Sequence, residues 1–400
     1  MNPAMSRSMV PPAPIPLLDT LSEWGSFHPG LARVRSVLAA LGHPEGTFRH
    51  LLVGGTNGKG TVAATLAREW TRGWASGSHG AVGLFLSPHL MDVRERITVW
   101  GQDGRGHWLP DAEWQEAYEA IRRAAPGVEL SYFEWLTVLA VVLFARRGVK
   151  AAVFEVGVGG REDATNVLDP ELSVVTGVSL DHTALLGGTV EAIAHHKVGI
   201  ARPGRGLVLP ASLLKKPPVA EAIRELGTVP VAFEDLDTAD PFEHNRRAII
   251  TALFCLGLTP STSPEVELQP LPGRREALSV GAGIYLDGAH NPQAWQGLLR
   301  WIAEVHGPEP INILTNLSQG REPQWLLDAL TPLARRFFYW DDPARLHERE
   351  LPAAAWPPEV ERIPTARLPT LLEEPLLVCG SLYTVGRFRR WLVERGLTLP

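Results

Sequence analysis

The stretch Gly54-Gly55-Thr56-Asn57-Gly58-Lys59-Gly60-Thr61 follows the apolar run 51–53 and precedes a helical pattern over 62–70. A strand, a glycine-rich turn, a lysine and a helix together direct backbone N–H groups toward phosphates at a helix N-terminus. The lysine adds a cation for the β- and γ-phosphates, and the threonine hydroxyl suits Mg²⁺. We therefore predict that the five residues from Asn57 to Thr61 bind ATP. The alternative is a glycine-rich turn that binds nothing.

The loop departs from the usual phosphate-binding spacing at one position. Gly60 stands between Lys59 and Thr61, whereas Ser or Thr normally follows the lysine directly. With this spacing, the loop fits fewer classes of nucleotide-binding enzyme than the usual phosphate-binding loop does.

The composition is that of a globular protein. The 400 residues are 45% hydrophobic, and a prior of about 150 residues per domain suggests two domains. The net charge of −6 argues against a dedicated nucleic-acid binder. No run reaches the roughly 18 apolar residues of a transmembrane helix. Cys255 and Cys379 lie in apolar patterns, so we expect both to be core residues of a cytoplasmic protein.

Strand and helix patterns alternate along the chain, which predicts an α/β fold with parallel-rich sheets covered by helices. We predict a P-loop-type ATPase domain over residues 17–262 and a smaller, Rossmann-like C-terminal α/β domain over residues 270–400. Turn-forming residues over 259–273 indicate the linker. The Pro- and Met-rich residues 1–16 are predicted to be a disordered tail.

Polar residues follow three predicted strands of the first domain, namely Ser87, Glu155 and the pair Asp181-His182. The carboxyl ends of parallel strands share one edge of a sheet, so these residues meet the glycine loop if the strands are neighbours. A hydroxyl, a carboxylate and an imidazole could then share a Mg²⁺ ion with phosphate oxygens. For His182 alone, the alternative is a hydrogen-bonded buried histidine.

Six motifs occur in a fixed order: GTNGKGT over 55–61, SPHL over 87–90, YFE over 132–134, EVGVGGREDATN over 155–166, DHT over 181–183 and LDGAHNP over 286–292. In this order they resemble the motifs of the folylpolyglutamate synthase family, which is often bifunctional with dihydrofolate synthase and belongs to the Mur ligase superfamily. The resemblance runs from about residue 17 to the C-terminus, and the motif over 155–166 is its most specific part.

The resemblance implies a ligase that uses ATP as co-substrate to add L-glutamate to the carboxylate of dihydropteroate or of a reduced folate. ATP phosphorylates that carboxylate, the amine of L-glutamate attacks the acyl phosphate, and phosphate leaves. One or two Mg²⁺ ions would serve as Lewis acid and template. The implied partners are these small molecules, with no nucleic acid and no membrane, and the implied state is a cytoplasmic monomer. Whether one or both activities are present stays open.

Residue roles follow from the matched motifs. The resemblance implies that Lys59, Lys197 and His182 are catalytic. It implies that Mg²⁺ is bound by Thr61, Ser87, Glu155 and His182. Lys197 would hold a second Mg²⁺ if it is carbamylated, and the alternative is an unmodified lysine that binds the acyl phosphate.

Two further sets of residues match the family's substrate contacts. In the second domain, Arg274, Asp287 and His290 resemble ATP contacts. In the first domain, the residues that match the folate pocket are Gly30, Leu31, Ser131, Phe133 and Asp163. Among them, the aromatic ring of Phe133 would stack on a pterin and the carboxylate of Asp163 would hydrogen-bond it. Core packing is the alternative for Phe133.

The chain also departs from the family pattern. Ala248 stands where an asparagine that contacts the nucleotide is usual, residues 316–320 lack the usual Lys-Asp pair, and Ser131 replaces a threonine. Two alternatives therefore stay open. One is another Mur-type amide ligase, and the other is a nucleotide-binding switch that hydrolyses ATP without ligation.

Overall fold

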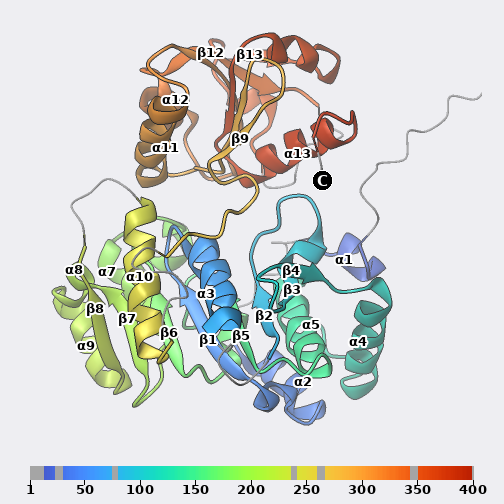
Figure 1. Cartoon of the computed structure of the whole chain (residues 1–400), viewed down its shortest axis with the longest axis vertical. Helices are drawn as coiled ribbons and strands as arrows, with labels where there is room; N and C mark the ends of the chain where they lie inside the picture. The colour runs from blue at the N-terminus through green and yellow to red at the C-terminus, as the bar shows by residue number, and fades with distance from the viewer. Residues whose placement is uncertain are drawn as a thin grey trace, which may run out of the picture. The chain divides into compact units, whose positions relative to one another are not determined.

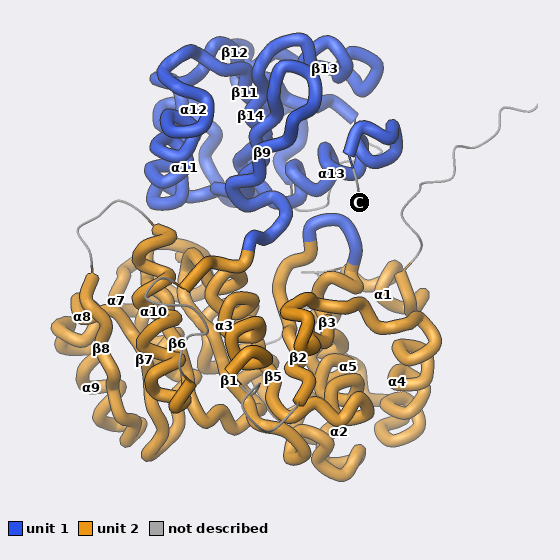
Figure 2. The backbone as a smooth tube through the Cα atoms, viewed as in Figure 1, with its two compact units in different colours: residues 1–11, 90–92, 270–400 blue, residues 12–89, 93–269 orange. Residues whose placement is uncertain are grey.

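The computed structural model describes residues 13–22, 30–73, 80–235, 241–258, 266–342 and 350–398. They form two compact units (Figure 2). The larger unit comprises residues 12–89 and 93–269, and the smaller unit comprises residues 270–400 together with Leu90–Asp92. Residues 1–12 of the predicted tail (1–16) and residues 259–265 of the predicted linker (259–273) lie outside the described residues, so the predicted domain limits stay predictions.

An eight-stranded sheet forms the centre of the larger unit, in the order β4-β3-β2-β5-β1-β6-β7-β8 (Figure 1). Its strands are β1 (Arg49–Gly54), β2 (Val82–Phe85), β3 (Ile97–Trp100), β4 (Gly106–Trp108), β5 (Ala151–Glu155), β6 (Leu172–Val175), β7 (Gly206–Pro210) and β8 (Val229–Phe233). Neighbouring strands are parallel except where β3 pairs with β2 and β4. The predicted parallel-rich sheet is confirmed, and the antiparallel β3–β4 hairpin is an addition to it.

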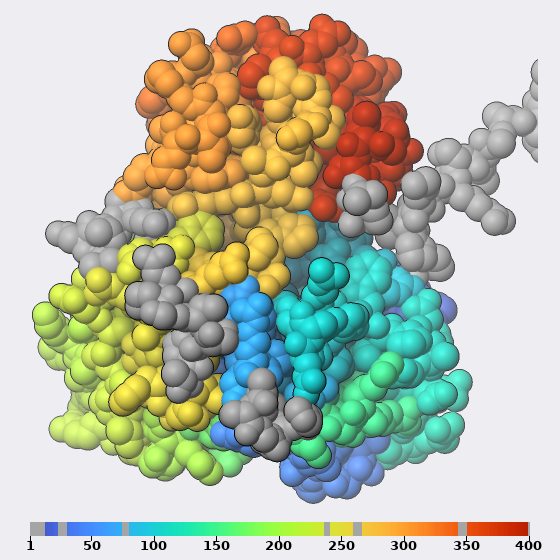
Figure 3. Space-filling model, in the orientation of Figure 1, coloured from blue at the N-terminus to red at the C-terminus, as the bar shows by residue number. Residues whose placement is uncertain are grey.

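Helices cover both faces of this sheet. Helices α3 (Lys59–Gly73) and α10 (Pro241–Cys255) lie on the face turned toward the viewer in Figures 1 and 3. The opposite face packs against α2 (Ala32–Ala40), α4 (Asp111–Ala124), α5 (Tyr132–Arg146), α7 (Val190–Val198) and α9 (Pro217–Leu226). The described residues of this unit also form the short α-helices α1 (Pro16–Thr20), α6 (Thr183–Leu186) and α8 (Ala211–Leu214).

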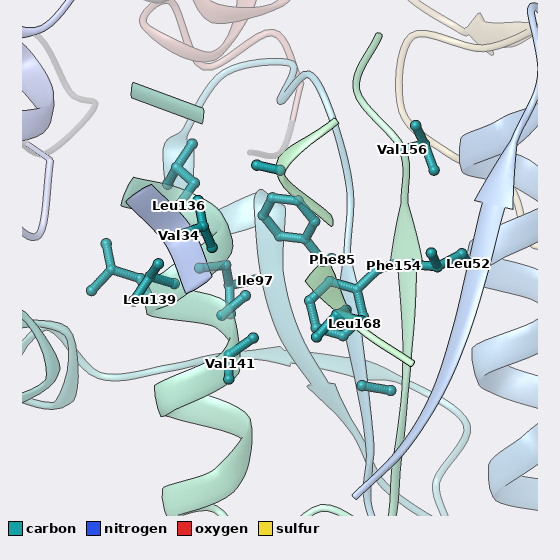
Figure 4. Close-up of a cluster of buried hydrophobic side chains, with 14 of the residues drawn as sticks. Val34, Leu52, Phe85, Ile97, Leu136, Leu139, Val141, Phe154, Val156 and Leu168 are labelled. Atoms are coloured by element: carbon teal, nitrogen blue, oxygen red, sulfur yellow. The ribbon is translucent and has the colours of Figure 1, made fainter. Parts of the chain in front are cut away.

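Side chains from α2, α5 and the central strands interlock in the hydrophobic core of the larger unit (Figure 4). The ring of Phe154 lies 5.7 Å from those of both Phe85 and Phe144, measured between centroids. Helix α5 is apolar around most of its surface and is buried along its length, as its sequence predicts. A capping box starts it, in which Ser131 and Glu134 satisfy each other's backbone N–H groups.

Strand β1 lies between β5 and β6, with Val53 beside Glu155 and Gly54 beside Val175. After β1 the chain crosses to β2 on one side of it, and after β5 it crosses to β6 on the other side. The carboxyl end of β1 is therefore a topological switch point. Ligands of open α/β sheets bind at such points. The strands that precede Ser87, Glu155, the glycine loop and Asp181 are consecutive in the sheet, in the order β2-β5-β1-β6. The condition set in the sequence analysis, that these strands be neighbours, is therefore met.

The smaller unit holds a six-stranded sheet in the order β13-β12-β11-β14-β10-β9. Its strands are β9 (Glu276–Leu278), β10 (Ile284–Leu286), β11 (Ile311–Thr315), β12 (Ala334–Trp340), β13 (Glu361–Ile363) and β14 (Leu376–Cys379), and only β9 is antiparallel to its neighbour. Its α-helices are α11 (Pro292–Val305), α12 (Pro323–Leu330) and α13 (Leu382–Val393). The predicted smaller α/β domain with a parallel-rich sheet is confirmed.

Leu90–Asp92 pack within the smaller unit, although they follow β2 in sequence. Any side chain at Gly386 would overlap the carbonyl oxygen of Leu90, and a Cβ at Gly273 would lie 2.8 Å from the Leu90 side chain. Arg390 donates to the Met91 carbonyl. These glycines therefore make room for the Leu90 backbone and side chain.

The two cysteines differ from each other. Cys379 is buried as predicted, whereas Cys255 is exposed at the C-terminal end of α10, so its prediction as a core residue is wrong. The apolar residues around Cys255 suggested a buried helix. Ile250 and Phe254 on the same helix are nevertheless exposed as well. In the described part of the chain, no helix combines the length and apolar character needed to cross a membrane.

Replacing Phe154 by Ala removes a fully buried ring from this core. We expect the free energy of unfolding of the larger unit to fall by about 3–5 kcal/mol, the usual cost of such a cavity. Urea denaturation measures it. Phe254→Ala is the matched control, because that ring is 82% exposed, and it should change stability by less than about 0.5 kcal/mol. Equal effects of the two substitutions would contradict the assignment of the core.

Candidate active site

The glycine loop between β1 and α3 is held by its neighbours. Thr56 N donates to the Gly177 carbonyl at 2.9 Å, and the Thr176 hydroxyl donates to the Asn57 carbonyl at 2.7 Å. Gly55 has φ +140°, and a side chain there would overlap the Thr176 hydroxyl. The loop is thus fixed against the segment that follows β6, and its glycines are required by close backbone approach.

Two lysines donate to successive carbonyls of this loop. Lys59 Nζ lies 3.3 Å from the Thr56 oxygen, and Lys197 Nζ lies 2.7 Å from the Gly55 oxygen. Burial, followed by the positive charge of Lys59, lowers the pKa of Lys197 to about 7. A large fraction of Lys197 is therefore an uncharged amine near neutral pH, the form that can react with CO₂.

Ser87 and Glu155 meet across neighbouring strands. The backbone N–H of Ser87 donates to Glu155 Oε2 at 2.9 Å, and Glu155 is buried. His182 has φ +49°, a backbone conformation that residues other than glycine rarely adopt. Its backbone N–H donates to Asp181 Oδ1 at 2.9 Å. An unusual conformation beside a buried aspartate supports a functional interpretation of His182.

The oxygen-bearing side chains Glu155 and Ser87 suit Mg²⁺ better than they suit a metal that is held by protein ligands alone. Among the described residues, no three His, Cys, Asp or Glu side chains form a metal-binding cluster. Mg²⁺ is usually held by one or two carboxylates together with substrate phosphates. One buried carboxylate, Glu155, beside a hydroxyl and the phosphate loop suits that mode, and the predicted ligands Thr61, Ser87 and His182 stay predictions.

The side chains of Phe133 and Asp163 both lie close to Gly157. A Cβ on Gly157 would stand 2.8 Å from Phe133 Cζ and 3.0 Å from Asp163 Oδ2. Burial raises the pKa of Asp163, against the opposing effect of its hydrogen bonds from Thr165 and the Val158 N–H. The half-buried Phe133 ring also packs 5.6 Å from that of Phe85. The structure thus brings together an aromatic ring and a carboxylate, as the pterin hypothesis requires.

The other predicted folate residues come from two helix starts. Ser131 is the N-cap of α5, and Gly30 and Leu31 directly precede α2. An ion pair between Arg33 and Glu134 connects these two helix starts.

In the smaller unit, Arg274, Asp287 and His290 gather around Gly288. A Cβ on Gly288 would lie 2.7 Å from Arg274 Nη1, and His290 Nδ1 lies 2.8 Å from the Gly288 oxygen. Asp287 accepts hydrogen bonds from the N–H groups of Arg275 and Ala289. Burial raises the pKa of its carboxyl group, and the charge of Arg274 opposes this.

Sequence reasoning missed Arg96. This fully buried residue donates from Nε to His89 Nδ1 at 2.8 Å and from Nη1 to Ser87 Oγ at 3.3 Å. Its guanidinium also lies 5.4 Å from the centre of the Tyr132 ring. No local spacing signals these contacts, because an arginine beside a short strand is ordinarily exposed.

Sequence reasoning also missed the contact of α10 with the loop. The side chain of Asn245 lies so close to Gly58 that any side chain at Gly58 would overlap it. Ala248, one turn further along α10, is fully buried and offers no polar atom. The amide nearest the loop on this helix is therefore that of Asn245.

Comparison with known proteins places this site in context. The chain is 30% identical over 416 residues to the folylpolyglutamate synthase of Lacticaseibacillus casei, covering 90% of this chain and 94% of that protein. It is 29% identical over 411 residues to a probable bifunctional folylpolyglutamate synthase/dihydropteroate synthase of Haloferax volcanii, and it spans 48% of the length of that relative. No family model matches the chain.

A solved structure shares the fold. It is a bifunctional folylpolyglutamate synthase/dihydrofolate synthase with Mn, AMPPNP and L-glutamate bound. Its TM-score is 0.77 at 25% identity, covering 95% of this chain and 98% of that chain. That protein holds an ATP analogue, a divalent metal and an amino acid.

The lowered pKa of Lys197 predicts a pH dependence of stability. Between pH 7 and 10 the unfolded chain keeps a proton on this lysine that the folded chain releases, so stability should rise with pH in this window. The slope contributed is at most about 1.4 kcal/mol per pH unit. Urea denaturation at pH 7, 8 and 9 in CO₂-free buffer should show a smaller slope for Lys197→Met than for the wild type. Lys215→Met, at an exposed lysine, serves as control, and identical slopes for all three proteins would refute the prediction.

Proposed function

Because this chain belongs to the folylpolyglutamate synthase/dihydrofolate synthase family, we propose that its glycine loop and the adjoining strand ends catalyse the ATP-dependent ligation of L-glutamate to a folate carboxylate. The observation that carries the proposal is the convergence of two lysines, Lys59 and Lys197, on one loop beside the buried carboxylate Glu155. Cations for phosphate and a carboxylate for metal are what phosphoryl transfer needs.

The first step is phosphorylation of the folate carboxylate. A carboxylate oxygen attacks the γ-phosphorus of ATP, the bond to the β,γ-bridging oxygen breaks, and ADP leaves. Asn57, Gly58, Gly60 and the N-terminus of α3 would hold the phosphates through backbone N–H groups. Lys59 would then exchange its carbonyl partner for phosphate oxygen and stabilise the charge that builds up there.

Bound Mg²⁺ would act as Lewis acid on the phosphate oxygens. Glu155, Ser87, Thr61 and His182 are the residues that we propose to hold it. Arg96 fixes the Ser87 hydroxyl, so the metal would be received by a side chain whose position is already set.

The second step forms the amide. The amine of L-glutamate attacks the acyl carbon, the bond from that carbon to the phosphate oxygen breaks, and inorganic phosphate leaves with the proton that the amine loses. We propose that Lys197 takes part in one of two forms. A carbamate would bind a second Mg²⁺, and an unmodified ammonium would bind the acyl phosphate.

Substrate recognition is assigned to two further sets. Phe133 and Asp163 would stack on and hydrogen-bond the pterin, with Gly30, Leu31 and Ser131 completing the pocket. Arg274, Asp287 and His290 would contact ATP from the smaller unit. The pairing of an aromatic ring with a carboxylate at Gly157 supports the first set.

We further propose that the protein works as a cytoplasmic monomer without nucleic acid. The acidic net charge and the scarcity of cysteine support this.

Phosphate release measured with ATP, Mg²⁺ and L-glutamate tests the function. We expect release that depends on both L-glutamate and a pterin acceptor, either 7,8-dihydropteroate or tetrahydrofolate. The response to each acceptor shows whether one or both activities are present. Release that is independent of glutamate and acceptor would instead support an ATP-hydrolysing switch.

Two substitutions test the site. Lys59→Ala should lower kcat by about 100-fold or more, since it removes the phosphate cation, and Glu155→Gln should raise the Mg²⁺ concentration for half-maximal rate by about tenfold or more. Lys215→Ala and Glu225→Gln, both at exposed positions, are matched controls that should behave as wild type. Normal turnover by Lys59→Ala, or an unchanged Mg²⁺ titration of Glu155→Gln, would remove that residue from the site.

A further inference from the structure

Arg33 and Glu134 form a forked ion pair between α2 and α5. Arg33 Nε donates to both carboxylate oxygens of Glu134, at 3.1 and 3.2 Å, and Nη2 donates to Oε1 at 2.9 Å. The Glu134 side chain is only 6% exposed, whereas that of Arg33 is 34% exposed. A planar fork on a carboxylate fixes orientation as well as distance. The pair therefore sets the start of α2 against the start of α5.

The same carboxylate also organises the first turn of α5. Glu134 Oε2 accepts a hydrogen bond from the backbone N–H of Ser131 at 2.8 Å. In return the Ser131 hydroxyl accepts one from the Glu134 N–H at 3.4 Å. One buried carboxylate thus holds Ser131 on its own helix and Arg33 on another.

Both partners are flanked by residues that we assign to the folate pocket. Gly30 and Leu31 lie just before Arg33, and Leu31 is an N-cap without a side-chain hydrogen bond. Gly30 has φ +125°, so the backbone there is not held by an ordinary helical or extended conformation. Ser131 is the N-cap of the first turn of α5, and Phe133 lies within that turn. The ion pair joins the two stretches of the pocket, although its partners lie 101 residues apart in sequence.

We propose that Arg33 is a positioning residue for the folate substrate, acting through Glu134 on the relative placement of Gly30-Leu31 and Ser131-Phe133. The inference rests on the proposed function, since it concerns the pocket assigned there. The inference adds Arg33, a residue outside the pocket, to those that determine the affinity for the pterin acceptor.

The other end of α5 provides a natural comparison. Arg147, directly after α5, makes a similar fork with Glu113 of α4, with Nε to Oε2 at 2.7 Å and Nη2 to Oε1 at 2.5 Å. This pair also ties α5 to a neighbouring helix, but no candidate folate residue adjoins it. Arg147→Met therefore reproduces the loss of an interhelical ion pair without disturbing the pocket.

The test compares Arg33→Met, Arg33→Lys, Glu134→Gln and Arg147→Met with the wild type. We expect Arg33→Met to raise the KM for 7,8-dihydropteroate about tenfold, equivalent to about 1.4 kcal/mol, and to leave the KM for ATP within about twofold. Arg33→Lys, which keeps the charge but loses the fork, should give a smaller increase. Arg147→Met should change neither KM. Thermal unfolding of each variant reports separately on stability.

Glu134→Gln separates positioning from direct binding. It leaves the Arg33 cation in place and keeps an oxygen for the Ser131 N–H, but it removes the charged partner of the fork. If Arg33 acts through Glu134, this variant should raise the KM for dihydropteroate as Arg33→Met does. The double variant should then be no worse than either single one. A KM that Glu134→Gln leaves unchanged or lowers would show that Arg33 binds the anionic substrate itself, and would overturn the proposal.

The remaining outcomes separate this inference from the proposed function. An unchanged KM for dihydropteroate in Arg33→Met overturns the inference alone, provided that the wild type turns over pterin acceptors. An equal rise in both KM values, also seen in Arg147→Met, points to general loosening and likewise overturns it. A wild type without pterin-dependent turnover overturns the proposed function, and the inference with it. Phe133→Leu, at a residue placed in the pocket, should raise the same KM and reports on the pocket independently of Arg33.

Discussion

The hydrogen-bonded position of β1 between β5 and β6 is the constraint on which the candidate site depends. Because Val53 pairs with Glu155 and Gly54 with Val175, the carboxylate at the end of β5 and the segment after β6 both reach the glycine loop. A slip of the register by one residue would turn Glu155 to the other face of the sheet. The placement of Glu155, the residue that we propose to hold the metal, is therefore a property of strand pairing as much as of the residue itself.

The loop so placed brings two lysine amines close together. Lys59 and Lys197 donate to neighbouring carbonyls, and burial in this setting lowers the pKa of Lys197. Such an arrangement costs free energy in the folded protein, and the lowered pKa of Lys197 reflects that cost. Features that lower the stability of the folded protein in this way are common at functional sites.

Much of the fold could be predicted from the sequence, because the glycine loop and the apolar runs that form β1, β5 and β6 are local signals. The β3–β4 hairpin was not predicted, since its strands are short, and the exposure of Cys255 contradicts the apolar pattern around it. In the candidate site, the loop and the residues after each strand follow from their motifs. Arg96, Asn245 and the pair Arg33–Glu134 could not be found in this way. Their contacts join segments far apart in sequence, and no spacing along the chain records such contacts.

The packing of Leu90–Asp92 within the smaller unit limits which fragments of this protein can form that unit. The smaller unit is not a continuous stretch of sequence, because a fragment that starts at Pro270 lacks the backbone for which Gly386 and Gly273 leave room. The connection between β2 and β3 is anchored in both units, so insertions and deletions there should be tolerated less well than in an ordinary surface loop. Natural length variation in relatives, and any attempt to transplant the C-terminal unit onto another protein, are subject to the same restriction.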